Sequence, residues 1–346
     1  MTQPHFSPRW PIQSPFTYFG GKSRIASAVW DRLGRVGQYV EPFAGSLAVL
    51  MRRPLPDGVE IVNDLDALVA NFWRSVRSRP GAVARAASYP VIEIDCHAEH
   101  DAQQRRKPRL ARMLADPHWC DAGLAGRWVW GMGCTIGDKW QVVNPLRSIP
   151  RVVGSGNGVH RKSLQAGPID GRVRFSEASI RAWMRQLADR LRYVRVCCGD
   201  WSRVLRESVL AEEGLTAVFL DPPYGVADRA DVYGQESRTV SAAVREWAIA
   251  HGGRPNLRIA LCGYEGEHAM PPDWSVLAWS APGGYGNMRK SAVGNANRHR
   301  ERIWFSPHCL PASRAGASTS VSPRSGCPCR PCPPRQRPAR RLDRPA

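Results

Sequence analysis

The feature that most constrains the fold is a short apolar run that ends abruptly in an acid, two prolines and an aromatic residue. Residues Ala217–Leu220 are followed directly by Asp221, Pro222, Pro223 and Tyr224. An apolar run of this length predicts a buried strand of a parallel sheet. Because neither proline has a backbone N–H to donate, the sheet must stop there. We therefore expect Asp221 and Tyr224 at the carboxyl edge, where open α/β sheets bind ligands.

The residues of this corner suit chemistry on an exocyclic amino group. The carboxylate of Asp221 and the carbonyl of Pro222 can both accept hydrogen bonds from one NH2 group. The ring of Tyr224 can stack on the heteroaromatic base that carries this group. Junctions between strands and loops also contain Asp and Pro for structural reasons alone. The functional interpretation therefore depends on the motifs that accompany the run.

The composition points to a polyanionic partner. The chain has 346 residues, enough for one large α/β domain with an insertion or for two domains. It contains 49 Lys and Arg against 30 Asp and Glu, a formal charge of +19. Eight Arg and one Asp lie in residues 311–346, so +12 remains in the rest. A GC-rich genome would also enrich Arg, but the chain stays basic without residues 311–346. Nucleic acid is therefore the first candidate partner.

The cysteines and the hydropathy favour a cytoplasmic protein with reduced thiols. The ten cysteines are scattered, no secretory leader opens the chain, and no apolar run approaches the roughly 18 residues of a membrane span. We therefore expect no membrane partner. Possible metal ligands occur in two groups, Cys96, His97 and His100, and Cys327, Cys329 and Cys332. Neither group has a partner cluster at zinc-site spacing, so we expect no metal.

A glycine pair and a lysine follow the N-terminal segment. Residues 1–14 are polar and contain proline, which predicts a flexible arm. The segment Tyr18-Phe-Gly-Gly-Lys22 comes next, and apolar residues at helical spacing run from Ile25 to Leu33. Two glycines before a lysine at a helix start allow a ligand to approach the backbone closely, and such a start suits a carboxylate or phosphate. Glycine pairs are also common in ordinary turns.

Two predicted strands end in acids. Residues 38–41 predict a strand, which is followed by a tight turn at Gly45 and a helix through Met51. The turn lacks the G-x-G-x-x-G spacing of dinucleotide binders, so adenosine is favoured over a pyrophosphate. Residues 59–64 predict a second strand that ends in Asp64, about 20 residues after the turn, where a ribose-binding carboxylate belongs in such folds. A solvated strand end is the alternative.

Residues 80–180, which follow a predicted helix from Asp66 to about Arg79, look less regular. They contain tryptophans at 119, 128, 130 and 140, basic clusters at residues 105–107 and 161–162, and a glycine-rich loop at 154–158. Basic residues interleaved with aromatic ones suit a nucleic-acid surface, because cations meet phosphates while rings stack or wedge. This favours a DNA-contacting insertion. Trp128 and Trp130 could equally fill a small core.

Regular structure is predicted again from about residue 176. A helix to Leu191 precedes a strand at 194–198, which ends in Gly199, Asp200 and Trp201. A carboxylate beside an aromatic ring could hold an adenine by accepting from its amino group. After Tyr224 we expect a polar loop, a helix through residues 240–248, and strands at 258–262, 274–279 and 302–305.

Two basic segments complete the chain. A glycine-rich stretch at 283–286, near Arg289, Lys290, Arg298 and Arg300, predicts a loop that touches a DNA backbone. Residues 309–346 are rich in Pro, Arg, Ser and Cys and lack apolar periodicity, so we expect a disordered tail. A phosphate-binding role and a sequence read in another frame are both open for this tail.

Five motifs in this order resemble those of the D12 class of adenine-specific DNA methyltransferases, the Dam-like or alpha-group enzymes. The motifs are Tyr18-Phe-Gly-Gly-Lys22, Glu41-Pro-Phe-Ala-Gly-Ser46, Asn63-Asp64, Gly199-Asp200 and Asp221-Pro-Pro-Tyr224. The closing segment at 302–308 is similar to copies carried by phages and prophages. The resemblance covers about residues 15–308. It implies a Rossmann-like S-adenosylmethionine-dependent methyltransferase sheet over 15–79 and 181–308, with a target-recognition insertion at 80–180.

The resemblance also implies a reaction and a set of site residues. The reaction is transfer of a methyl group from S-adenosyl-L-methionine to N6 of adenine in double-stranded DNA, by base flipping and direct transfer without a metal. Lys22 would lie near the cofactor carboxylate, Asp64 would bind the ribose hydroxyls and Asp200 the adenine. The other implied cofactor contacts are Tyr18, Phe43, Gly45 and Asp221. At the target base, Asp221 and the Pro222 carbonyl would hold the amino group while Tyr224 stacks on the flipped ring.

Two alternative functions stay open. Methylation of cytosine N4, or of RNA or protein amides, needs the same two acceptors. Against it, an acid rather than Ser or Asn opens the tetrapeptide, and the Gly-Gly-Lys element precedes the glycine turn. A DNA-binding protein with a decayed active site would be favoured by loss of Asp221 or Lys22, and both are present. The sequence leaves open the recognition sequence, the oligomeric state and a cognate restriction endonuclease as partner.

Overall fold

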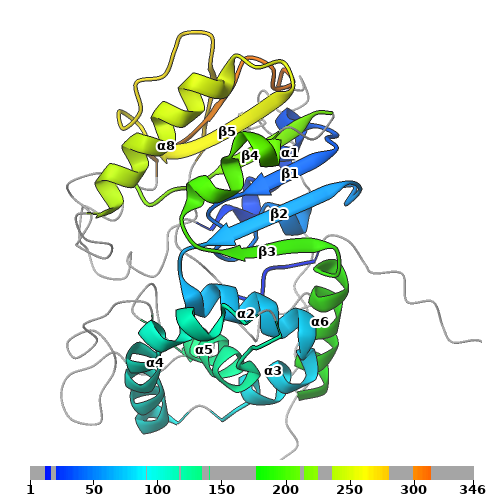
Figure 1. Ribbon diagram of the computed structural model, residues 1–346, viewed down its shortest axis with the longest axis vertical. Coiled ribbons are helices and arrows are strands. Elements are labelled where there is room, and N and C mark those ends of the chain that lie inside the picture. Colours follow the sequence, from blue (N-terminus) through cyan, green and yellow to red (C-terminus); the bar gives the residue numbers. More distant parts are fainter. Residues whose placement is uncertain are drawn as a thin grey trace, which may run out of the picture. The chain divides into compact units, whose positions relative to one another are not determined.

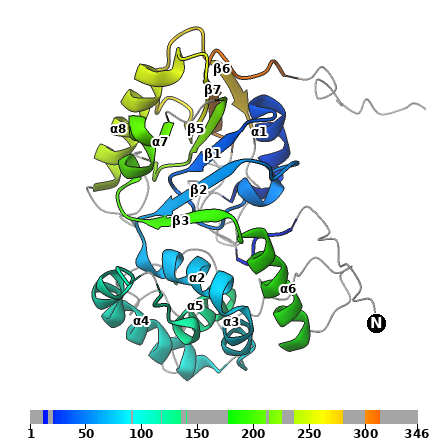
Figure 2. The same cartoon turned by 45° about the vertical axis from the view of Figure 1, so that its right-hand side comes forward.

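The described part of the chain contains one sheet of seven strands. The computed structural model describes residues 12–16, 21–90, 92–116, 118–134, 140, 177–210, 214–224, 236–279 and 299–312. The strands are β1 (Gln38–Glu41), β2 (Val59–Asp64), β3 (Val194–Cys198), β4 (Thr216–Leu220), β5 (Leu257–Tyr264), β6 (Ser275–Ala278) and β7 (Glu301–Phe305). Figure 2 shows them side by side from β3 at one edge to β6 at the other, and Figure 1 shows the strands from β3 to β5 in the same order.

The strand order defines the fold class. The order is β3-β2-β1-β4-β5-β7-β6. The five strands from β3 to β5 run parallel, while β7 is antiparallel to both β5 and β6. The sheet is therefore mixed α/β and mostly parallel, which is compatible with a Rossmann-like fold and confirms the predicted class at that level. Strand order reverses direction between β1 and β4, and ligands bind at such switch points in open sheets.

Helices cover both faces of the sheet and extend beyond β3. The α-helices are α1 (Ala26–Leu33), α2 (Ala67–Ser78), α3 (Pro80–Ala87), α4 (Glu93–Met113), α5 (Ala122–Cys134), α6 (Glu177–Arg190), α7 (Glu207–Leu210) and α8 (Glu236–Gly252). Short 3-10 helices are η1 (Lys22–Arg24), η2 (Leu50–Arg52) and η4 (Trp201–Leu205). Figures 1 and 2 show α8 beside β5 and α2 to α6 gathered next to β3.

Alternating side chains of the strands build two apolar cores, one on each face. Tyr39 and Phe219 join the cluster that extends into α1, α2, α5 and α6. Val40 and Val218 point to the opposite face and pack with residues of α8. This alternation is the period of two of a β-strand. Because β4 is apolar toward both faces, it occupies a central position in the sheet, as its uninterrupted apolar run predicts.

The structure corrects two predictions of regular structure. The segment after Gly45 is not a continuous helix: Leu47 adopts φ 55° and only the 3-10 turn η2 follows. Residues 80–134 are largely helical rather than irregular, because they form α3, α4 and α5. Trp128 and Trp130 are each 2% exposed, so they fill a core. The role of residues 80–180 as a target-recognition insertion stays a prediction.

The two ends of the described chain pack against the body. Ile12, in the predicted flexible arm, is buried, and Ser14 Oγ donates to the Ser46 carbonyl at 2.7 Å. The predicted disordered tail also begins too early, since Leu310 N donates to the Arg32 carbonyl at 2.8 Å. Other predictions lie outside the described residues: Tyr18, the arm over 1–11, residues 141–176, the loop at 280–298 and the tail over 313–346.

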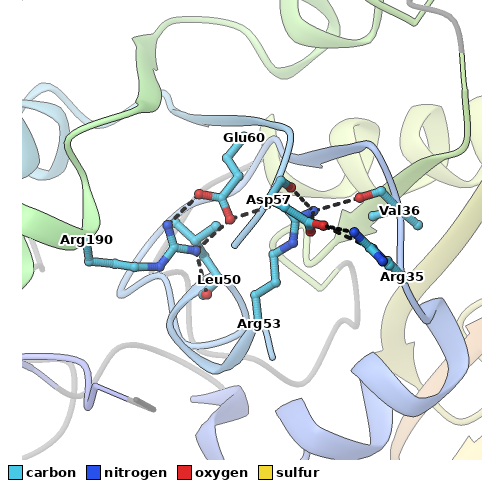
Figure 3. Close-up of polar contacts among 7 residues, drawn as sticks. All are labelled: Arg35, Val36, Leu50, Arg53, Asp57, Glu60 and Arg190. Carbon is cyan, nitrogen blue, oxygen red and sulfur yellow. Dashed lines mark hydrogen bonds and ion pairs between the residues drawn. The ribbon is translucent and has the colours of Figure 1, made fainter. Parts of the chain in front are cut away.

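A buried ion-pair network lies at the amino end of β2 (Figure 3). Glu60 accepts from Arg53 Nη1 at 3.0 Å and from both Nη atoms of Arg190, with Nη2 at 2.6 Å. The same arginines donate to the carbonyls of Val36 at 2.8 Å and Leu50 at 3.1 Å. All three charged side chains are at most 5% exposed. The network therefore ties α6 and the η2 segment to β1 and β2.

Membrane spans and metal sites can be assessed for the described residues. Among these, no helix combines the length and the apolar character needed to cross a membrane. No group of three His, Cys, Asp or Glu side chains in the described ranges could hold a metal ion. Cys96 and His100 are both buried in the helical region, and the cysteines at 327, 329 and 332 lie outside the description.

Candidate active site at the carboxyl edge of the sheet

Four acidic residues gather where parallel strands end. Glu41 ends β1 and Asp64 ends β2, while Asp200 and Asp221 come shortly after β3 and β4. These four strands are adjacent and parallel, so their carboxyl ends lie along one edge. The amino-edge network of Glu60 lies at the opposite ends of the same strands. The candidate site is therefore defined by strand direction.

The glycine turn after β1 is held against the end of β2. Gly45 has φ 43°, a backbone conformation that a side chain would strain. Its N–H donates to Asp64 Oδ2 at 2.9 Å, and the N–H of Asp66 donates to Asp64 Oδ1 at 2.8 Å. Trp73 Nε1 donates to the Gly45 carbonyl at 2.9 Å. The predicted ribose-binding acid and the predicted cofactor glycine are thus in direct contact.

Asp64 carries a perturbed acidity. Burial raises its pKa to about 6, and nearby Asp66 acts in the same direction. The hydrogen bonds from the N–H groups of Asp66 and Gly45 oppose this rise because they favour the carboxylate. Asp64 is therefore mainly ionised at neutral pH and can accept hydrogen bonds from hydroxyl groups.

Asn63 joins the ends of three strands. Its buried Nδ2 donates to the Pro42 carbonyl at 3.1 Å and to the Gly199 carbonyl at 2.9 Å. The backbone repeats this link, because Gly199 N donates to the Asp64 carbonyl at 3.1 Å. The loops after β1 and β3 are therefore fixed relative to β2 by hydrogen bonds. A pocket formed by these loops would be preorganised.

An aromatic pair and an exposed acid flank this corner. The rings of Phe43 and Trp201 are nearly parallel, with an interplanar angle of 26° and centroids 6.3 Å apart. Asp200 is exposed and caps η4 by accepting from Ser202 N at 2.9 Å. Flat apolar faces beside a hydrogen-bond acceptor are the features that bind an adenine ring. The three predicted contacts Phe43, Asp64 and Asp200 thus lie at or just after strand ends along one edge.

A second cluster forms around Lys22 at the end of β4. Lys22 Nζ lies 3.0 Å from Asp221 Oδ1 and 2.9 Å from the Tyr224 hydroxyl, and its side chain is 3% exposed. The Glu301 Oε2 atom lies 3.8 Å from the same Nζ. The structure therefore brings the Lys22 of the glycine-lysine motif to the predicted catalytic acid.

The ionisation of this cluster is shifted by burial and by the opposite charges. Burial lowers the pKa of Lys22, but Asp221 and Glu301 outweigh it, so the net pKa lies above the usual range. Burial, then the negative charges of Asp221 and Glu301, hold the pKa of the Tyr224 phenol well above its usual value. Lys22 is therefore charged and Tyr224 is neutral over the physiological range.

Glu41 is a third acid near the cluster. It is buried and accepts from the Tyr39 hydroxyl at 3.0 Å. Burial raises its pKa to about 8, although the bond from Tyr39 lowers it, and the charge of Asp221 contributes to the rise. Glu41 is thus largely protonated at neutral pH. The sequence motif that contains Glu41 predicted that this residue ends a strand. The raised pKa of Glu41 could not be predicted from the sequence.

The Tyr224 ring lies in a packed environment. It is 5% exposed and meets Tyr264 edge to face, with centroids 4.7 Å apart and planes at 70°. Its hydroxyl lies 3.1 Å from Asp221 Oδ1 and 2.9 Å from Glu301 Oε2. The predicted stacking of Tyr224 on an extruded base would require that one face of the ring be uncovered.

Sequence reasoning missed Glu301. This residue opens β7 and is paired in register with Tyr264 at the end of β5. Because β7 is antiparallel to β5, its first residue lies at the carboxyl edge of the parallel strands. An acid at the start of a predicted apolar strand was a signal, but the direction of that strand could not be known. Tyr18 lies outside the described residues, so its predicted contact stays untested.

Neither the scan against protein-family models nor the search of curated proteins found a match.

Proposed function

We propose that this protein transfers a methyl group from S-adenosyl-L-methionine to N6 of adenine in double-stranded DNA. The observation that carries the proposal is the acceptor pair at the end of β4. Asp221 Oδ1 lies 3.0 Å from Lys22 Nζ and 3.1 Å from the Tyr224 hydroxyl, and no hydrogen bond from a described residue reaches its Oδ2. Pro222 is the next residue, and its carbonyl is the second acceptor. The fold class and the ordered motifs support the same reaction.

The residues of the β1–β3 corner fit an adenosine-bearing cofactor. Asp64 can accept from ribose hydroxyls, since both of its oxygens keep further lone pairs beside the bonds from Gly45 and Asp66. Phe43 and Trp201 offer ring faces, and the exposed Asp200 offers an acceptor for an adenine amino group. When bound, S-adenosyl-L-methionine supplies the methyl group.

The acceptor pair can activate an amino group for transfer. An aromatic amine is a weak nucleophile because its lone pair is delocalised into the ring. Acceptance of both N–H hydrogens by Asp221 and Pro222 favours a pyramidal nitrogen with a localised lone pair, and precise positioning then supplies much of the rate. The nitrogen must also lose one proton, and the Asp221 carboxylate is an acceptor bonded to it.

The charge of α4 supports duplex DNA as the substrate. Four arginines in its second half are exposed: Arg105, Arg106, Arg109 and Arg112. Lys107 on the same helix pairs with Asp66 at 2.8 Å, two residues after Asp64, which ties α4 to the carboxyl edge. Arginines at spacings of four and three share one helix face. Such a row beside the site suits phosphate contacts, which orient a duplex.

The test is an incubation with isotopically labelled S-adenosyl-L-methionine and unmethylated duplex DNA, followed by digestion to nucleosides. The proposal expects the label in N6-methyladenosine. Label on cytosine would reassign the protein to cytosine-N4 methylation, and label on RNA or protein amides only would reassign it to those substrates. A folded sample that binds the cofactor yet transfers no label would indicate a DNA-binding protein with a decayed active site.

A further inference from the structure

Glu301 is a buried acid that touches the candidate catalytic cluster from the far end of the described chain. Its residue exposure is 4%, and its Oε2 lies 2.9 Å from the Tyr224 hydroxyl and 3.8 Å from Lys22 Nζ. Burial of a carboxylate is costly unless it is paired. The next residues of β7 inside the core, Ile303 and Phe305, are apolar. An acid at this position therefore needs an explanation that packing does not give.

The number of protons in the cluster limits which hydrogen bonds can form at the same time. The Tyr224 hydroxyl carries one proton, so it can donate to Glu301 or to Asp221 but not to both at once. The contact to Glu301 is the shorter, 2.9 Å against 3.1 Å. Lys22 donates to the same hydroxyl at 2.9 Å and pairs with Asp221 at 3.0 Å. When the Tyr224 hydroxyl donates to Glu301, Lys22 is the described donor that holds Asp221 Oδ1.

We infer that Glu301 is a positioning residue for the Asp221 acceptor. It accepts a hydrogen bond from the Tyr224 hydroxyl and pairs with the Lys22 ammonium, so that Lys22 orients Asp221 with Oδ2 turned to the amino group of the substrate. This role rests on the proposed function, because it concerns the same site. It adds a residue from β7 to the four strands that the sequence motifs identify.

Substitutions can distinguish a positioning role of Glu301 from a role in packing alone. Glu301→Met keeps the length of the side chain but removes the acceptor, so the Tyr224 hydroxyl becomes available to donate to Asp221. Glu301→Gln restores an acceptor oxygen without the charge. A purely structural role would make both variants alter stability and activity together. A positioning role makes kcat fall, while cofactor affinity stays as in the original protein.

The first experiment measures methyl transfer and cofactor binding for these variants. Glu301→Met should lower kcat roughly 10- to 100-fold, with an unchanged Kd for S-adenosyl-L-methionine, and Glu301→Gln should recover part of the loss. In a Tyr224→Phe background, Glu301→Met should cost less than about threefold more, because the hydroxyl is already gone. Equal factors in both backgrounds, or a Kd that weakens as much as kcat falls, would overturn the inference.

The matched control is Glu265→Gln. Glu265 lies just after β5 near the same edge, but it is exposed and pairs with Arg302 at 2.8 Å, outside the cluster. We expect it to leave kcat within about twofold of the original protein, since exposed ion pairs contribute little. Thermal unfolding of every variant establishes that the compared proteins are folded.

A second measurement does not depend on methylation. In protein labelled with 3-fluorotyrosine, the fluorine resonance of Tyr224 is the one absent from Tyr224→Phe. It should shift in Glu301→Met and stay in place in Glu265→Gln. An unmoved resonance in Glu301→Met would refute the hydrogen bond, even if the protein methylates DNA. A shifted resonance in a protein that transfers no methyl group would refute the proposed function and leave the contact intact.

Discussion

The two buried ion networks of the sheet differ in how their charges are balanced. At the amino edge, two arginines surround Glu60 and also bind the backbone carbonyls of Val36 and Leu50. At the carboxyl edge, one lysine stands between Asp221 and Glu301. At the amino edge, both arginines bind the acid and also backbone carbonyls. At the carboxyl edge, Asp221 Oδ2 receives no hydrogen bond from the described residues.

We interpret the network at the amino edge as structural and propose that the one at the carboxyl edge is functional. Removal of one partner from a buried ion pair leaves an uncompensated charge and costs stability. An acid at a binding edge can instead have an oxygen that accepts no hydrogen bond from the protein. Such an oxygen lowers the stability of the folded state, and only a bound ligand that donates to it restores this stability. We therefore expect variants at the amino edge to unfold the protein and variants at the carboxyl edge to inactivate it.

The largest expected effect belongs to the carboxyl edge. Asp221→Ala should lower methyl transfer at least about 10³-fold, because it removes an acceptor made for the transition state. Cofactor affinity should change little, and Lys22 keeps Glu301 as a partner, so the melting temperature should be close to that of the original protein. Asp221→Asn retains one carbonyl oxygen and should be less severe. Unchanged turnover in Asp221→Ala would contradict the role of this acid.

The next effect belongs to the amino edge and concerns stability. Glu60→Met should reduce the free energy of unfolding by about 3–5 kcal/mol, because it leaves two buried guanidinium groups without their shared acid. Urea denaturation followed by circular dichroism measures this loss. The folded fraction should keep the kcat of the original protein. Asp189→Asn, which alters the exposed pair of Asp189 with Arg192 beside Arg190 on α6, is the control and should change stability little. A stable but inactive Glu60→Met would erase the contrast between the edges.

A smaller effect should appear in the pH dependence of stability. The pKa of Glu41 is raised by burial from 4.5 to about 8, so the folded state holds a proton that the unfolded state releases. The stabilisation from this group is complete below pH 4.5 and is lost as pH rises through about 8. The whole change is on the order of 5 kcal/mol, of which roughly 2–3 kcal/mol falls between pH 6 and pH 8. Urea titrations of Glu41→Gln should show a flatter profile over this range, and an unaltered slope would argue against the shift.

The smallest predicted effect concerns cofactor affinity at the same edge. Since the pKa of Asp64 is raised to about 6 by burial, its carboxylate is protonated at pH 5. Hydroxyl groups then lose an acceptor, so the Kd for S-adenosyl-L-methionine should weaken by roughly tenfold between pH 7 and pH 5. Calorimetric titration measures this change. Asp64→Asn should bind weakly at both values, and a pH dependence that persists in this variant would assign the titration to another group.

Strands were predictable where a run of apolar residues had clear ends. β2 and β3 coincide with the predicted segments at 59–64 and 194–198. The helices of residues 80–134 were missed for two physical reasons. α4 is polar along most of its length, and α5 is buried on nearly every side, so neither shows an apolar stripe with a period of 3.6 residues.

The site was predictable only in the part that strand ends determine. Asp64, Asp200 and Asp221 could be placed at one edge because parallel strands align their carboxyl ends. The contacts of Lys22 with Asp221 and Glu301 depend on how η1 and β7 dock on the sheet, which no local pattern encodes. The position of Glu301 required the direction of β7, and a single strand pattern carries no direction.

The antiparallel course of β7 has a consequence for the order in which the site can form. Lys22 enters the cluster from the first helical turn of the described chain, and Glu301 enters from its last strand. During synthesis from the N-terminus, strands β1 to β5 are complete long before this last segment leaves the ribosome. Contacts between such distant segments also form late in folding, because they require the longest loops to close. The complete cluster therefore forms only after β7 has been synthesised, and a product that ends before β7 would lack Glu301.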